Sequence, residues 1–116
     1  MESFTARIAE RMEHAQQRAQ HLRAAVPELA RELLARGATR VVLVGSLARG
    51  DRFNVDTDVD LVVWGMEMGD AYDAACTLGA RVNARVEVIP FELCGPRLLR
   101  AIDTEGIDVT ERDDAA

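Results

Sequence analysis

The stretch Arg40-Val41-Val42-Leu43-Val44-Gly45-Ser46 is followed, after a polar loop, by Thr57-Asp58-Val59-Asp60-Leu61-Val62-Val63-Trp64. Each half contains a short run of β-branched and aliphatic residues, which is typical of a strand buried on both faces. A glycine and a serine end the first run, and two aspartates open the second. The stretch therefore predicts two neighbouring buried strands, with polar groups gathered where one ends and the other begins.

A helical pattern precedes these strands. Apolar or small residues recur at spacings of four and three and form one helical stripe. The stripe consists of Ile8, Met12, Ala15, Ala19, Leu22, Val26, Leu29 and Leu33. Because Pro27 lacks an amide hydrogen and clashes with the preceding turn, we expect two helices here, the second beginning near Pro27 and ending at Gly37.

Further elements follow the second strand. After a loop bracketed by Gly65 and Gly69, the sequence predicts a helix over 71–83, a strand over 84–90, a short helix over 96–104 and an edge strand over 107–110. This order predicts an α/β (α+β) fold with a small mixed sheet and helices mainly on one face. The order of the strands in the sheet does not follow from the sequence.

The composition indicates one acidic globular domain. We expect the 116 residues to form a single domain, with a helical segment at about 3–36, a core at about 37–110 and a charged tail at 111–116. The net charge of −6 repels polyanions, so extended nucleic-acid binding is not expected. No membrane span or leader is evident, and the two cysteines have no metal-binding spacing, which together predict a cytoplasmic location.

Gly45 and Ser46 predict a phosphate-binding turn. They leave a buried strand and enter a short turn or helix, where amide groups and a serine hydroxyl can hold phosphate oxygens. Glycine also allows phosphate to approach the backbone closely. Arg49 has two interpretations: it binds the γ-phosphate, or it pairs with Asp51 or with a helix end.

Asp58 and Asp60 predict a metal site. They stand two apart in an extended segment, so both carboxylates project to one face. Oxygen ligands of this kind suit Mg²⁺. Glu87, in the middle of the third strand, shares that face if the third strand lies beside the second. There it would ligate the metal or accept a proton from the attacking group.

Asp56 and Asp58 form an alternative pair with the same spacing. We favour Asp60 over Asp56, because Asp60 lies inside the strand whereas Asp56 lies in the polar loop. Asp56 could still assist by orienting a metal ligand.

These motifs resemble the minimal nucleotidyltransferases of the DNA polymerase β-like superfamily, which are often encoded beside HEPN-domain proteins as toxin–antitoxin pairs. The likeness spans roughly 33–110 and rests on a hydrophobic strand, Gly-Ser, Ala-Arg-Gly and then Asp-x-Asp, all in order. The resemblance implies that Gly45, Ser46 and Arg49 contact the triphosphate, and that Asp58, Asp60 and Glu87 serve metal binding and catalysis.

The chain departs from the family's pattern at several positions. The third acidic position is more often aspartate than glutamate, serine is usual where Thr57 stands, and phenylalanine is frequent where Val44 stands. The loop before the aspartates is also about one residue longer. Of these departures, only the one at Glu87 concerns a residue with an implied catalytic role. The side chain of glutamate is one methylene longer than that of aspartate.

The resemblance implies transfer of a nucleoside monophosphate, AMP from ATP, to a hydroxyl of a HEPN-domain protein, with one or two Mg²⁺ ions. Two other hypotheses stay open at this point. The chain could be a non-catalytic antitoxin that masks its partner sterically, or a nucleotidyltransferase acting on a small molecule or an RNA end. Homo-oligomers are compatible with the sequence, which does not decide whether they form.

Overall fold

The computed structural model describes residues 3–50 and 57–110. Asp51, Asp56 and the tail 111–116 lie outside the described residues. The elements are, in chain order, α1 (Phe4–Ala35), β1 (Arg40–Val44), α2 (Ser46–Arg49), β2 (Val59–Trp64), α3 (Met68–Val82), β3 (Val86–Pro90), the short 3-10 helix η1 (Phe91–Leu93), α4 (Pro96–Glu105) and β4 (Ile107–Asp108).

The described strands form one four-stranded mixed sheet in the order β3-β2-β1-β4. β1 runs antiparallel to both β2 and β4, whereas β2 and β3 are parallel and are joined through α3. The predicted α/β class and mixed sheet are therefore confirmed. The two strands of the deciding stretch lie side by side at the centre of the sheet, which is why their residues are buried on both faces.

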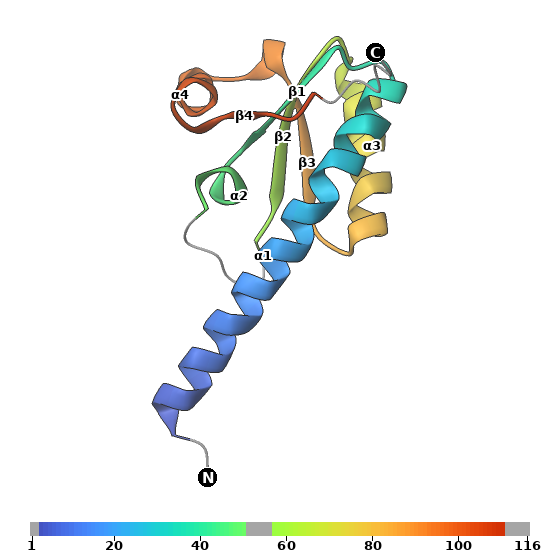
Figure 1. Cartoon of the computed structure of the whole chain (residues 1–116). Coiled ribbons are helices and arrows are strands. Elements are labelled where there is room, and N and C mark those ends of the chain that lie inside the picture. Colours follow the sequence, from blue (N-terminus) through green and yellow to red (C-terminus); the bar gives the residue numbers. More distant parts are fainter. Residues whose placement is uncertain (1–2, 51–56, 111–116) are drawn as a thin grey trace, which may run out of the picture.

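The two long helices α1 and α3 cover one face of the sheet, and α4 lies against the other (Figure 1). The larger core cluster lies under α1 and α3 and includes Val41, Leu61 and Val88. A smaller cluster on the opposite face joins Val42, Val44 and Val62 to side chains of η1 and α4. The prediction of helices mainly on one face is thus confirmed, with α4 as the element on the second face.

The predicted break at Pro27 is wrong, because α1 runs without interruption from Phe4 to Ala35 with Pro27 inside it. A proline inside a helix costs about 3 kcal/mol, since it removes one hydrogen bond and strains the preceding turn. Leu22, Val26, Leu29 and Leu33 are almost completely buried on both sides of the proline. Burial of each such side chain contributes about 1.5–3 kcal/mol, so packing against the sheet outweighs the proline.

The predicted end of this helix at Gly37 is confirmed. Gly37 has φ +113, and the amide of Ala38 donates to the carbonyl of Leu33 at 3.0 Å. The amide of Gly37 donates to Leu34 at 3.2 Å, which completes the paired bonds of a Schellman motif. A left-handed glycine therefore turns the chain directly from α1 into β1.

Other boundaries differ from the prediction as well, among them the start of β3, which lies at Val86 rather than at Ala84. α3 begins at Met68 rather than Ala71, because Gly65, with φ +86, makes the turn alone and Gly69 is left to the first turn of the helix. β4 ends at Asp108 rather than Thr110. There the Thr110 hydroxyl accepts the amide hydrogen of Val41 at 2.9 Å, so a side chain takes the place of the backbone ladder.

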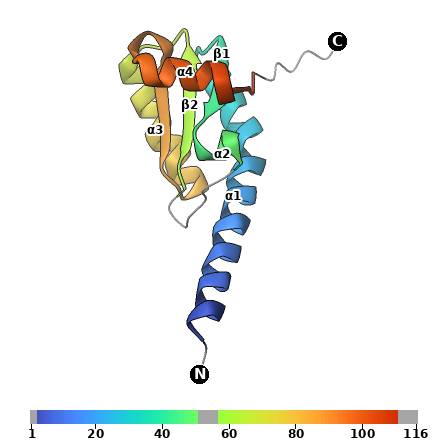
Figure 2. The same ribbon diagram turned by 90° about the vertical axis from the view of Figure 1, so that its left-hand side faces the viewer.

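The N-terminal part of α1 extends past the sheet as a single helix (Figures 1 and 2). Its apolar side chains Phe4, Ile8 and Met12 are exposed, and the buried stripe begins only at Ala15. Within residues 3–50 and 57–110, no helix has both the length and the apolar character needed to cross a membrane.

Candidate active site

Two of the three sequence-predicted carboxylates, Asp60 and Glu87, meet on the face of the sheet against which α4 lies, and Asp58 does not line the cavity there. Asp60 lies opposite Val44 of β1 and opposite Glu87 of β3 in the strand register. Val59 and Leu61 point into the core beneath α1 and α3, so Asp60 points the other way. Asp60 and Glu87 therefore lie on the same face of the adjacent strands β2 and β3. β2 lies beside β1, the strand that leads to Gly45.

Gly45 and Asp60 approach each other so closely that only glycine fits. Gly45 has φ 81 and ψ −162, which side-chain-bearing residues rarely adopt. A Cβ atom added to Gly45 would lie 2.5 Å from Oδ2 of Asp60. The turn that leaves β1 thus presents its backbone directly to the carboxylate on β2.

The helix α2 begins immediately after this turn. The amides of Ala48 and Arg49 donate to the Gly45 carbonyl at 3.1 and 3.0 Å, while the first amides of any helix have no acceptor within it. Leu47 is fully buried, and the guanidinium of Arg23 on α1 donates to its carbonyl. Core packing and a hydrogen bond from α1 therefore hold the Gly45-Ser46 turn beside Asp60.

Burial raises the pKa of the Asp60 carboxyl from its ordinary value of 3.8 to about 6. The negative charges of Glu87 and Asp58 and a hydrogen bond with the Glu87 side chain contribute smaller parts of this rise in pKa, and only Arg85 opposes it. Acidic groups thus crowd around Asp60 with too little positive charge to balance them. A cation bound beside Asp60 would relieve this repulsion.

Arg85 is a site residue that the sequence analysis missed. Its guanidinium forms an ion pair with Glu87, with Nη2 2.8 Å from Oε1. Arg85 and Glu87 stand two apart in an extended segment, so both lie on one face. This spacing could have indicated from the sequence that Arg85 lies beside Glu87. Glu87 therefore contacts both a carboxylate on β2 and a cation at the start of its own strand.

The donor set suits a divalent cation in its chemistry. Asp58, Asp60 and Glu87 offer carboxylate oxygens, which Mg²⁺ prefers. Within residues 3–50 and 57–110, however, no three acidic, histidine or cysteine side chains are arranged so that they could already hold a metal ion. The carboxylates therefore suit a cation that takes some of its oxygen ligands from a bound phosphate. They do not form a site in which protein side chains alone surround the cation.

A cavity of about 390 Å³ opens between this face and α4. Gly45, Asp60 and Glu87 line it from the sheet, and Arg97 and Glu105 line it from α4. The sequence predicted α4 but not that it would face the carboxylates, because its position depends on the sheet order. The cavity joins the glycine turn, the carboxylates and one basic side chain.

Arg49 contacts Glu105, one of the residues of α4 that line this cavity. Its Nη1 atom lies 3.2 Å from both carboxylate oxygens of Glu105, the last residue of α4. This contact agrees with the interpretation that Arg49 pairs with a helix end, and Asp51 lies outside the described residues. The pair connects the end of α2 to the end of α4.

The one tryptophan and the two histidines of the chain lie away from these carboxylates or on the exposed surface of α1. Trp64 stacks on Phe91 with ring centroids 4.7 Å apart, and the Arg40 guanidinium lies 4.5 Å from the Trp64 ring centroid. Trp64 ends β2 whereas Asp60 lies near its start, so Trp64 packs away from the carboxylates. His14 and His21 are exposed on α1.

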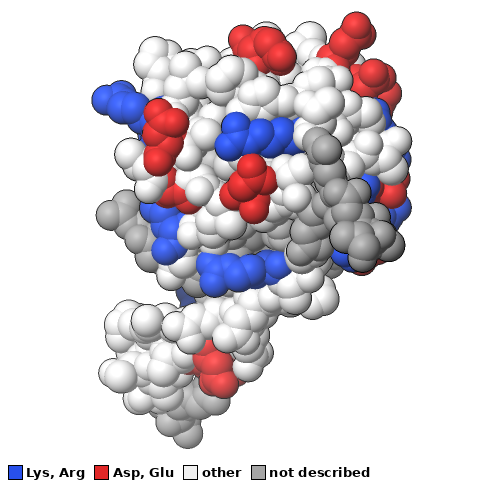
Figure 3. Space-filling view, turned by 45° about the horizontal axis from the view of Figure 1, so that its top comes forward, with Lys and Arg blue, Asp and Glu red and all other residues white. Residues whose placement is uncertain are grey.

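The surface charge is mixed rather than divided into large areas of one sign. Figure 3 shows basic and acidic side chains interspersed among uncharged ones over the described part of one face. Together with the net charge of −6, this pattern offers no continuous basic track for a polyanion on the part of that face the structure describes.

No protein-family model matches the chain, and no curated protein matches it. Solved structures do. One described as a minimal nucleotidyltransferase is 32% identical, with a TM-score of 0.60, and the match covers 77% of this chain and 93% of that one.

Toxin–antitoxin complexes share the fold at lower identity. One complex, solved with AMP-PNP, is 16% identical with a TM-score of 0.62 over 78% of this chain and 74% of the other. Another contains a tri-AMPylated HEPN toxin from Shewanella oneidensis with its MNT antitoxin, at 16% identity and a TM-score of 0.56 over 78% and 71% of the two chains. The resemblance drawn from the motifs is thereby confirmed. Because it is 32% identical to a minimal nucleotidyltransferase and covers 93% of that chain, this chain belongs to the minimal nucleotidyltransferase family.

Proposed function

We propose that the chain transfers a nucleoside monophosphate, AMP from ATP, to a hydroxyl group of a HEPN-domain protein, as the antitoxin of a toxin–antitoxin pair. The observation that carries this proposal is the position of Asp60, between the backbone of Gly45 on one side and Glu87 on the other. Gly45, at the turn that we propose binds phosphate, and the carboxylates of Asp60 and Glu87 line one small cavity. This combination suits the transfer of a phosphate group.

In the proposed reaction, the acceptor oxygen attacks the α-phosphorus of the nucleotide. A new oxygen–phosphorus bond forms, the bond between the α-phosphorus and the bridging oxygen breaks, and pyrophosphate leaves. Gly45 and Ser46 hold the phosphates through backbone amides and a hydroxyl. Glu87, whose Oε1 lies 2.8 Å from Nη2 of Arg85, accepts the proton of the acceptor hydroxyl. Asp58 and Asp60 would hold Mg²⁺, which would supply positive charge to the phosphates.

The size of the cavity supports an acceptor on another molecule. A volume of about 390 Å³ lies near the lower end of the roughly 300–1,000 Å³ typical of small-molecule sites. A nucleotide would occupy most of it and leave little room for a second substrate. The similar complexes, one with AMP-PNP and one with an AMPylated HEPN toxin, support ATP and a HEPN-domain protein for these roles.

The test is transfer of label from α-labelled ATP to the partner in the presence of Mg²⁺. We expect Asp60→Asn to lower transfer at least a hundredfold, because it removes a metal-binding charge beside the phosphates. Asp73→Asn changes an exposed carboxylate on α3 and serves as the matched control, with transfer at the wild-type level. Equal transfer by both variants would refute the role of Asp60.

A non-catalytic antitoxin is the second candidate, and one observation favours it. Glu87 is already paired with Arg85, and the described residues contain no ready three-ligand metal cluster. If masking is sufficient, a chain carrying both Asp58→Asn and Asp60→Asn will still neutralise the partner with unchanged affinity. Loss of neutralisation together with intact complex formation would favour the enzyme.

A further inference from the structure

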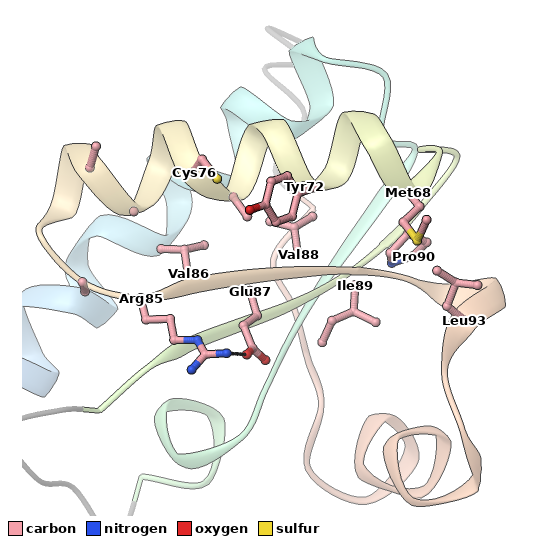
Figure 4. Close-up of a pocket in the computed structure, with 14 residues that line it drawn as sticks. Met68, Tyr72, Cys76, Arg85, Val86, Glu87, Val88, Ile89, Pro90 and Leu93 are labelled. Atoms are coloured by element: carbon pink, nitrogen blue, oxygen red, sulfur yellow. Dashed lines mark ion pairs between the residues drawn. The ribbon is translucent and has the colours of Figure 1, made fainter.

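A second and larger cavity lies on the far side of Glu87, along the outer edge of the sheet (Figure 4). It has a volume of about 700 Å³ and is bounded by β3 and by the outward side of α3. Large apolar side chains stand exposed at one end: Met68 at 67%, Tyr72 at 69% and Leu93 at 58%. This chain's own core does not cover them, so the groove offers an apolar surface to another molecule.

The floor of the groove is a strand edge with available hydrogen-bonding groups. β3 ends the order of the described sheet, and its only neighbour there is β2. The amide of Val59 donates to the Arg85 carbonyl at 3.0 Å. In a parallel pair this pattern directs the backbone amides and carbonyls of alternate residues, here Glu87 and Ile89 after the Arg85 carbonyl, toward β2. The amides and carbonyls of Val86 and Val88 therefore point into the groove. A strand with this arrangement pairs with an extended backbone.

The wall formed by α3 leaves space for an additional strand. The residues that face the groove along the middle of α3 are small, namely Ala75, Cys76, Gly79 and Ala80. Neighbouring strands lie about 4.8 Å apart, so an added strand would lie at that distance from β3, and the small residues of α3 leave room beside it. Figure 4 shows Val86 and Val88 pointing from β3 toward α3, and Glu87 pointing the opposite way.

The groove is continuous with the candidate active site. Glu87 and Ile89 line both cavities. In an added strand, the residue opposite Glu87 directs its side chain to the same face as Glu87 and Asp60. Its two neighbours direct their side chains beneath α3. A strand paired with β3 would therefore direct every second side chain to the face of the carboxylates, and the side chain opposite Glu87 would lie beside them.

We propose that this groove docks an extended segment of the partner protein, which pairs with β3 as a fifth strand and presents the acceptor hydroxyl opposite Glu87. This proposal rests on the proposed function. The segment carries apolar residues directly before and after the hydroxyl residue, to pack beneath α3. It carries an acidic residue two positions away, opposite Arg85, whose side chain is 70% exposed.

A second copy of this chain is the competing occupant. A twofold pairing of β3 with itself centred on Glu87 would oppose two Glu87 side chains, which repel each other. A pairing centred on Val86 would match Arg85 with Glu87 of the second copy. It would, however, leave Met68 and Leu93 at the other end of the groove uncovered. A separate extended segment covers both ends.

The first test measures complex formation with the full-length HEPN-domain partner in the absence of nucleotide. Cys76→Arg places a long charged side chain in the groove, whereas Thr77→Arg places the same side chain on the next exposed position of α3, which does not line it. We expect Cys76→Arg to weaken binding at least tenfold and Thr77→Arg to leave it unchanged. Equal binding by the two variants, or no complex with the wild-type chain, overturns the proposal.

The second test measures amide hydrogen exchange, residue by residue, in the full chain. We expect the amides of Val86 and Val88 to exchange rapidly in the free chain and at least tenfold more slowly in the complex. Those of Glu87 and Ile89, directed toward β2, should be protected in both. Unchanged exchange at Val86 and Val88 overturns the proposal, as does a free chain that is already dimeric with both amides protected. If the amides become protected but no AMP is transferred, the docking site stands and the proposed function fails.

Discussion

The carboxylate of Asp60 fills the space beside Gly45, so position 45 has no room for a side chain. The carboxylate of Asp60 stands where the Cβ atom of any other residue at position 45 would lie, and the backbone of Gly45 has a positive φ. A substitution at position 45 therefore strains the turn and displaces the carboxylate at the same time.

Gly45→Ala should lower the free energy of unfolding by roughly 1–3 kcal/mol and weaken binding of ATP with Mg²⁺ at least tenfold. Urea denaturation and calorimetric titration measure the two effects. Gly69→Ala is the matched control, because a Cβ at Gly69 meets nothing within 4 Å, and its stability should stay within about 0.5 kcal/mol of wild type. Wild-type nucleotide affinity in Gly45→Ala would contradict the close approach.

The raised pKa of Asp60 has a consequence for stability. Between pH 3.8 and about 6 the folded chain holds a proton that the unfolded chain has released, so this group lowers the free energy of unfolding as pH rises through that window. Below the window both states are protonated and the effect disappears. The charged form of Asp60 is therefore a cost to the fold at neutral pH.

Asp60→Asn should accordingly be more stable than wild type at pH 7, on the order of 1 kcal/mol after allowance for solvent screening, and close to wild type at pH 3.5. Urea denaturation at the two pH values, without Mg²⁺, measures the difference. A variant less stable than wild type at pH 7 would show that the carboxylate stabilises the fold instead.

The sequence identified Gly45, Asp60 and Glu87 because their spacing along strands fixes the direction of each side chain. It did not identify Arg85 as a partner of Glu87, or Glu105 as a partner of Arg49. The second pair joins residues 56 positions apart, and such a contact depends on where α4 lies against the sheet. Contacts of this kind follow from tertiary packing rather than local pattern.

At the scale of elements, α1 shows how packing overrides local preference. Pro27 removes one backbone donor from the helix, yet buried side chains on both sides keep the helix continuous. The strands 40–44 and 59–64 were predicted at their observed bounds, because a continuous apolar run bounded by polar residues leaves few alternatives. The helix break was predicted wrongly because the burial of Leu29 and Leu33 against the sheet is a tertiary effect.

Pro27→Ala should raise the free energy of unfolding by about 1–3 kcal/mol, since it restores an amide donor and relieves the preceding turn. The gain is reduced by the greater freedom of alanine in the unfolded chain. Glu28→Ala, at the next and exposed position, should change stability by less than about 0.5 kcal/mol. Urea denaturation compares the two, and a loss of stability in Pro27→Ala would mean that the proline ring packs favourably.

At the scale of the whole molecule, the chain divides into a packed body and a projecting helix. The first turns of α1 extend beyond the sheet with Phe4, Ile8 and Met12 exposed (Figure 2). Helical order at that end is not supported by burial within this chain.

A chain that starts at Met12 should keep the stability of the full chain to within about 0.5 kcal/mol, because the buried stripe begins at Ala15. Chemical denaturation of both chains at equal concentration measures this. A large loss of stability would show that the removed turns are buried between copies, and sedimentation of the full chain would then reveal an oligomer.

The pairing of Val44 with Asp60, and of Asp60 with Glu87, spans three adjacent strands. The distance between the two carboxyl-bearing strands is therefore set by the spacing of a hydrogen-bonded ladder, about 4.8 Å, and not by the connections between the strands. Insertions and deletions in those connections leave the ladder unchanged. The distance between the strands that carry Asp60 and Glu87 is thus insulated from changes in loop length.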